Sequence, residues 1–166
     1  MIIRVPWVID LEPLRVAVMP RPHGGELLEI SMQALRQQGV DVLVSMLEYE
    51  EQEMFELVAQ GAHCAAVGID FLNVPVRDRG VPRSPRALLP HAKKLAEDLK
   101  AGKGVAFHCF AGIGRSPLMA ACTLALLGWT PEKSFAAISK TRGLEVPDTD
   151  EQLKFAQGFA RSMRAG

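Results

Sequence analysis

Cysteine is scarce in this chain, and the cysteines that are present form no recognisable pattern. There are three, an odd number, and their positions lack the spacing of metal ligands. Secreted domains held by disulfides carry paired cysteines at higher density, so the composition argues against a disulfide framework. It favours a reducing compartment and a single working thiol.

The chain also lacks an excess of charge and any long apolar run. Its 19 Lys and Arg residues balance 19 Asp and Glu residues, so we expect neither nucleic acid nor a membrane surface as partner. No apolar run reaches the roughly 18 residues that span a bilayer. Residues 1–6 lack the apolar core and cleavage site of a signal peptide. We therefore expect a soluble cytoplasmic protein with one domain over residues 1–166, assumed to be a monomer.

Apolar runs of strand length alternate with amphipathic segments of helical period. The runs that predict strands cover residues 7–9, 14–18, 40–46, 69–74 and 104–107. The segments that predict helices cover residues 26–38, 48–60, 84–101, 116–127 and 131–141, and a last helix begins within 147–152. The unbroken apolar character of residues 40–46 is typical of a parallel strand buried on both faces. The pattern predicts an α/β fold with a central, mostly parallel sheet flanked by helices.

Residues 108–116 lie between the last predicted strand and an apolar helix. Gly112 and Gly114 permit the unusual dihedrals of a loop that curls its N–H groups inward. A helix N-terminus beneath such a loop collects unpaired N–H donors and positive dipole charge, which suits an anion. Arg115 adds a planar fork that can hold two phosphate oxygens.

Cys109 lies in the same electropositive surroundings, which favour the nucleophilic thiolate form of a cysteine. An anion-binding loop with a thiolate at its base predicts attack on a phosphate ester through a phosphocysteine. The alternative is a buried structural cysteine beside a helix-capping loop.

The motif His-Cys-x-x-Gly-x-x-Arg-Ser at residues 108–116 resembles the signature loop of the cysteine-dependent protein tyrosine phosphatases. The short chain resembles their dual-specificity branch. The resemblance implies that Cys109 is the nucleophile, that Arg115 clamps the phosphate, and that Ser116 assists departure of the thiolate. It also implies that His108 organises the loop, that no cofactor or metal is needed, and that the phosphate is bound by Phe110, Ala111, Gly112, Ile113, Gly114 and Arg115.

A phosphatase of this kind also needs an acid to protonate the leaving oxygen, typically for a factor of ~10²–10⁴ in rate. Asp78 is the best candidate, because it follows a predicted strand in a proline-rich loop 31 positions before Cys109 (109 − 78). The family carries its general acid at about this separation. Asp148 and Asp150 are rival acids, although helix capping also explains them. The resemblance implies that Gln152 orients the water that hydrolyses the phosphocysteine.

Further residues have a functional and a structural interpretation. The cluster of Glu48, Glu50, Glu51 and Glu53 is interpreted as a solvated helix face. Cys64 is the candidate resolving partner for an oxidised Cys109, and Cys122 is interpreted as a core residue. Basic residues that could face a substrate from loops are Arg21, His23, Arg77, Arg79 and Arg83.

The substrate prediction depends on the variable positions of the loop, none of which is basic: Phe110, Ala111, Ile113 and Gly114. Inositol-lipid phosphatases of the superfamily commonly carry lysines there. A phosphorylated protein or peptide is therefore the expected partner, hydrolysed at phosphotyrosine with or without phosphoserine and phosphothreonine, in a shallow, permissive pocket. The alternatives are a phosphoinositide or other non-protein phosphomonoester, a pseudophosphatase that binds phosphoproteins, and a rhodanese-like or arsenate-reducing enzyme.

Overall fold

The computed structural model describes residues 4–165 and is built on a five-stranded sheet with the order β1-β2-β5-β3-β4. β1 runs antiparallel to β2, whereas the other neighbouring strands are parallel. The strands are β1 (Trp7–Leu11), β2 (Leu14–Met19), β3 (Val42–Ser45), β4 (Asp70–Asn73) and β5 (Gly104–His108). The predicted α/β fold with a mostly parallel sheet is confirmed.

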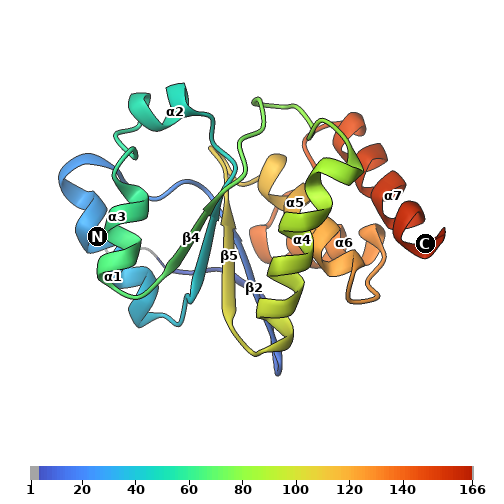
Figure 1. Ribbon diagram of the computed structural model, residues 1–166, viewed down its shortest axis with the longest axis horizontal. Coiled ribbons are helices and arrows are strands. Elements are labelled where there is room, and N and C mark those ends of the chain that lie inside the picture. The colour runs from blue at the N-terminus through green and yellow to red at the C-terminus, as the bar shows by residue number, and fades with distance from the viewer. Residues whose placement is uncertain (1–3, 166) are drawn as a thin grey trace.

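The helices lie in two groups on the two sides of the sheet, which Figure 1 shows nearly edge-on. The first group follows β2 and β3 in the chain: the 3₁₀ helix η1 (Gly25–Leu27), α1 (Leu28–Gln37), α2 (Tyr49–Met54) and α3 (Gln60–Ala66). The second group covers the other side: α4 (Pro85–Lys100), α5 (Arg115–Ala125), α6 (Pro131–Arg142) and α7 (Asp150–Ala165). None of the helices within residues 4–165 has the length and apolar character to cross a bilayer.

Alternate residues of the inner strands pack into two separate cores, as strand geometry requires. In β2, Val16 and Val18 face the core under α4 to α7, whereas Ala17 and Met19 face the core under α1 and α3. All residues of β5 are buried, because helices cover both faces of the central strand. β5 therefore gives rigid support to the loop of residues 109–114 that follows it.

One predicted helix is wrong. The periodicity over residues 48–60 predicts one helix, but α2 ends at Met54 and α3 begins at Gln60. Between them Glu56 has a φ of 55°, a left-handed conformation that interrupts helical hydrogen bonding. The carbonyl of Glu56 accepts a hydrogen bond from the N–H of Gly25 at 2.9 Å, so a tertiary contact stabilises this turn.

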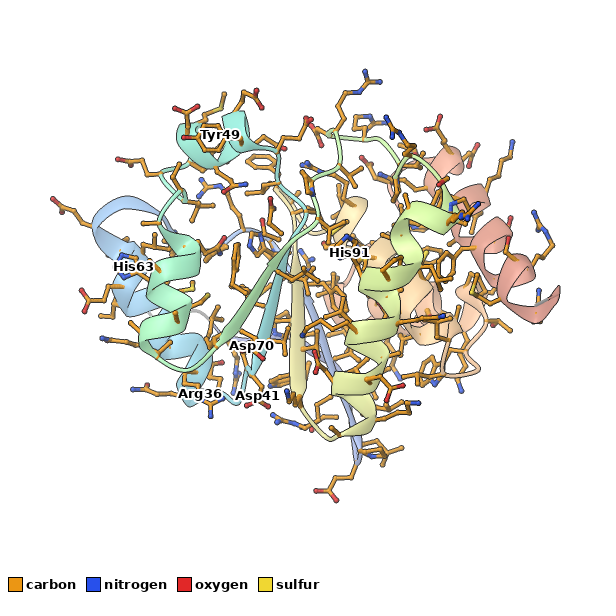
Figure 2. All side chains as sticks on the ribbon, viewed as in Figure 1. Arg36, Asp41, Tyr49, His63, Asp70 and His91 are labelled. Carbon is orange, nitrogen blue, oxygen red and sulfur yellow. The ribbon has the colours of Figure 1, made fainter. Side chains whose placement is uncertain are left out.

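Charged residues tie the chain together at the amino ends of the parallel strands. Figure 2 shows Arg36, Asp41 and Asp70 there, at the end opposite Tyr49 of α2. Asp41 pairs with Arg36 and accepts a hydrogen bond from the N–H of Gly104 at 2.8 Å. These contacts of Asp41 fix the start of β5. Open α/β sheets bind ligands at the opposite, carboxyl end of their strands, so we expect the site there.

Candidate active site

The candidate site is a strand–loop–helix unit in which β5 runs into residues 109–114 and then into α5. Gly112 has a φ of 72°, and a Cβ there would meet the Arg142 Nη1 at 2.3 Å and the Met19 carbonyl carbon at 2.6 Å. A Cβ on Gly114 would lie 2.9 Å from the amide of Gln152. Both glycines are needed because neighbouring groups press closely against the loop.

The carbonyl groups of His108 and of three loop residues, Phe110, Ala111 and Gly112, are held by residues outside the loop. The carbonyl of His108 accepts from the N–H of Met46 at 3.0 Å, and that of Phe110 accepts from the N–H of Arg21 at 3.0 Å. Two further carbonyls, those of Gly112 and Ala111, accept from the guanidinium of Arg142 at 2.6 and 3.1 Å.

The backbone N–H groups of residues 110–114 differ from these carbonyl groups in their hydrogen bonding. Within residues 4–165 none of them has a protein acceptor. Because the C=O and N–H of a trans peptide point in opposite directions, holding the carbonyls of residues 110–112 outward turns the N–H groups of residues 111–113 toward the inside of the loop. Unpaired donors at a helix N-terminus form a binding site for an oxyanion.

Cys109 lies at the base of this loop. Its Sγ is 3.2 Å from the hydroxyl of Ser116 in the first turn of α5, and the cysteine is only 4% exposed. The preceding residue, His108, is fully buried, and its Nδ1–H donates to the carbonyl of Cys109 at 3.2 Å. Because a carbonyl oxygen only accepts, the proton of the neutral ring lies on Nδ1, and Nε2 faces the side-chain amide of Gln60, 3.0 Å from its nitrogen and 3.3 Å from its oxygen.

The protonation of His108 follows from its burial. Desolvation lowers its pKa to about 4, and the positive charges of Arg115 and Arg21 act in the same direction, against the hydrogen bond to Cys109. At neutral pH the ring is therefore uncharged and acts as a fixed hydrogen-bonding spacer beneath the loop.

Arg115 begins α5 with its side chain almost completely buried. Two of its nitrogens pair with the two carboxylate oxygens of Glu51 at 2.7 and 2.9 Å, and Nη1 also donates to the carbonyl of Val76 at 2.8 Å. Burial acts to lower the pKa of Arg115, but the hydrogen bond from Arg115 to Glu51 and the nearby negative charges raise it overall. The interpretation of Glu51 as part of a solvated face is wrong, because a charge buried this deeply requires a partner.

The loop after β4 brings Asp78 to the same guanidinium. Its Oδ1 lies 3.3 Å from Nη2 of Arg115, and its side chain is 67% exposed. Arg79, in a left-handed conformation with a φ of 62°, pairs with Asp148 at 2.7 Å. The amide of Gln152 donates to the carbonyl of Gly80 at 3.1 Å, so two contacts hold this loop against the start of α7.

These residues enclose a pocket of about 210 Å³. It is lined by Asp78, Arg79, Cys109, Phe110, Ala111, Ile113, Gly114, Arg115, Asp148 and Gln152. A larger hollow of about 430 Å³ shares Asp148 but does not reach Cys109, and its lining includes Glu132, Glu145 and Asp150. An acidic lining repels phosphate, so the smaller pocket is the candidate active site.

Some predicted residues lie elsewhere. Cys64 belongs to the core under α1 and α3, on the opposite face of the sheet from Cys109, and burial raises its pKa to about 12. The structure therefore does not bring the two sulfurs together. Asp150 lines the larger hollow, Arg83 lines a third one, and His23 and Arg77 are exposed on the surface.

Several residues that build the site were not predicted from the sequence: Glu51, Phe55, Gln60 and Arg142. Arg142 precedes the helix-ending Gly143, where a basic residue is ordinarily explained by the helix dipole. Gln60 is a fully buried polar residue, which only the fold reveals. Contacts between residues so far apart in the chain leave no local pattern to find.

Comparisons with known proteins identify the family and the fold of the chain. The sequence family described as "Polymorphic toxin system, DSP-PTPase phosphatase" matches residues 17–129, which is most of the chain. The chain belongs to this family. The match runs from β2 through α5 and so includes the cysteine loop, whereas α6 and α7, with Arg142 and Gln152, lie beyond it. No match is found among curated protein sequences.

Solved structures share the fold at low identity. Kinase associated phosphatase, crystallised with its catalytic-site cysteine replaced by serine, has a TM-score of 0.80 and 20% identity, over 92% of this chain and 89% of the other. PTPMT1 in complex with PI(5)P has a TM-score of 0.74 and 22% identity, over 93% and 94%. The human tyrosine phosphatase-like serine/threonine/tyrosine-interacting protein has a TM-score of 0.70 and 15% identity, over 91% and 93%.

Proposed function

We propose that the protein hydrolyses phosphotyrosine, with or without phosphoserine and phosphothreonine, in protein substrates through a phosphocysteine at Cys109. The observation that carries the proposal is the orientation of the loop beside Cys109: the carbonyls of residues 110–112 are bound from outside, and the N–H groups of residues 110–114 have no acceptor within residues 4–165. Preorganised donors of this kind stabilise the negative charge of a phosphoryl group in the transition state.

In the first step the thiolate of Cys109 attacks phosphorus, a P–S bond forms and the ester P–O bond breaks. The proton for the leaving oxygen comes from Asp78. In the unliganded arrangement this carboxylate contacts Nη2 of Arg115. A phosphate oxygen that takes this N–H in its place separates Asp78 from the guanidinium, and the carboxyl group can then carry the proton.

In the second step water attacks phosphorus, the P–S bond breaks, and Asp78 accepts the proton of the water. The hydroxyl of Ser116, 3.2 Å from Sγ, donates a hydrogen bond to the departing thiolate. Gln152 lines the pocket with its amide next to Gly114, a position from which it can orient the water.

A protein substrate is supported by the lining of the pocket. Its loop positions carry apolar or small residues, Phe110, Ala111, Ile113 and Gly114, and no lysine that would add charge for a polyphosphorylated headgroup. PI(5)P is bound by a protein of the same fold, so a phosphoinositide is the second candidate. A phosphoprotein-binding role without turnover is the third, and the intact set of Cys109, Arg115 and Ser116 argues against it.

One set of assays distinguishes these functions. We expect the wild-type protein to hydrolyse para-nitrophenyl phosphate and a phosphotyrosine peptide, and to hydrolyse PI(5)P in vesicles much more slowly. Cys109→Ser abolishes turnover of all of them. Faster hydrolysis of PI(5)P would favour the lipid, and wild-type binding of the peptide without turnover would favour the pseudophosphatase. A preference above about a thousandfold between matched phosphotyrosine and phosphothreonine peptides would contradict the shallow, permissive pocket that we propose.

A further inference from the structure

One residue that lines the candidate pocket, Phe110, is aromatic and packs against a second aromatic ring. Phe110, the residue after Cys109, stacks on Phe55 with ring centroids 5.1 Å apart and an interplanar angle of 22°. The guanidinium of Arg21 lies 4.3 Å from the centroid of the Phe55 ring and 6.0 Å from that of Phe110. We call Phe110, Phe55 and Arg21 the aromatic rim.

The aromatic rim is built from three segments that lock together. The N–H of Arg21 donates to the carbonyl of Phe110 at 3.0 Å, and the N–H of Gly25 donates to the carbonyl of Glu56 at 2.9 Å. A Cβ on Gly24 would meet the carbonyl oxygen of Phe55 at 1.9 Å, so only glycine allows this approach. The break between α2 and α3 therefore places Phe55 against the catalytic loop.

Phe110 is nevertheless 46% exposed, and it lines the pocket that contains Cys109. Large apolar side chains on a surface are informative when they gather at a functional cavity. Phe55 stacks on the Phe110 ring and Arg21 covers Phe55, so the Phe110 ring is held in place while the residue stays half exposed at the pocket. Stacking keeps it there with little freedom left to lose when a ligand binds.

We propose that the aromatic rim binds the aryl ring of phosphotyrosine and so gives the enzyme a moderate preference for aryl over alkyl phosphate esters. The proposal rests on the phosphatase function proposed above and names the residues that select its substrate. Phosphothreonine presents no ring to Phe110, so it gains nothing from this contact. The energies of aromatic pairs correspond to a change of about three- to tenfold in kcat/KM, well within a permissive pocket.

The test compares kcat/KM for two peptides of one sequence that carry phosphotyrosine or phosphothreonine. The variants are Phe110→Leu and Phe55→Leu, which remove aromatic character and keep apolar bulk. The matched control is Phe71→Leu, the same change in β4, at a residue that packs against the core under α1 and α3 and does not line the pocket. The readout is the ratio of the two kcat/KM values, because this ratio cancels any general loss of active enzyme.

We expect the ratio to fall by about three- to tenfold in Phe110→Leu, by less in Phe55→Leu, and to stay at the wild-type value in Phe71→Leu. An unchanged ratio in Phe110→Leu would overturn the proposal and leave the phosphatase function standing.

Affinities of the two peptides for Cys109→Ser, alone and combined with Phe110→Leu, give the same comparison without turnover. A wild-type enzyme that hydrolyses neither peptide would refute the proposed function. The rim proposal then requires tighter binding of the phosphotyrosine peptide to Cys109→Ser, and loss of that difference with Phe110→Leu. Equal binding of the two peptides would overturn it.

Discussion

Replacing Arg142 with glutamine tests whether the catalytic loop is held in its active shape from outside. Arg142 donates to the carbonyls of Gly112 and Ala111 at 2.6 and 3.1 Å, and these bonds turn the N–H groups of Gly112 and Ile113 inward. Hydrogen bonds from a charged donor contribute about 1.5–3 kcal/mol each, and water recovers part of this in a half-buried site. We therefore expect the free energy of unfolding to fall by about 1–3 kcal/mol.

The effect on catalysis is larger, because the loss of one aligned oxyanion donor typically costs ~10²–10³-fold in rate. We expect Arg142→Gln to lower kcat/KM for para-nitrophenyl phosphate by about 10²-fold, and Arg142→Lys, which keeps one bond, by about tenfold. Lys140→Gln removes an exposed charge from the same helix and serves as the control. Steady-state kinetics and urea unfolding measure both effects. An Arg142→Gln enzyme within twofold of wild type would refute the reasoning.

Three further predictions concern single groups of the site. Asp78→Asn should lower kcat/KM for a phosphothreonine peptide by ~10²–10⁴-fold, and para-nitrophenyl phosphate should suffer less because its leaving group needs no proton; equal losses in peptide and ester assays would contradict the acid role. Ser116→Ala should lower kcat, because the departing thiolate of Cys109 loses the hydrogen bond from the Ser116 hydroxyl, 3.2 Å from Sγ. Since only the second step is slowed, stopped-flow traces should show a burst of nitrophenolate. A burst phase that is itself slowed would place the serine in the first step instead. The pKa of His108 is about 4 in the folded protein and near 6.5 in the unfolded chain. Between these pH values only the unfolded chain binds the proton, so the free energy of unfolding should fall as the pH drops from 6.5 to about 4. The loss should be on the order of 3 kcal/mol in urea titrations, and the same fall in His108→Asn would disprove its origin.

The strand–loop–helix unit around Cys109 could be predicted from the sequence because its signals are local. An apolar strand, two glycines, an arginine and an apolar helix follow one another within residues 104–127, and each of these signals predicts the local conformation of the residues that carry it. Asp78 was predicted as a candidate from its position in a proline-rich loop, and the structure brings it to within 3.3 Å of Arg115. Its role as the acid stays a prediction.

The partners of the loop could not be predicted, because they act across the fold. Glu51 lies 64 positions from Arg115, and its neighbouring acids made a solvated helix face the simpler interpretation. The helix predicted over residues 48–60 breaks because Glu56 bonds to Gly25 and Phe55 stacks on Phe110, contacts that override local periodicity. Such long-range contacts determine whether a segment with a helical sequence pattern forms one continuous helix.

The most direct test of the account is to find where the phosphoryl group goes. A phosphotyrosine substrate labelled in its phosphate is mixed with enzyme, the reaction is quenched in the burst phase, and the modified residue is located by mass spectrometry. We predict that the label lies on Cys109, and that Cys109→Ser gives neither label nor turnover. Label on another residue, or turnover by Cys109→Ser, would contradict the account.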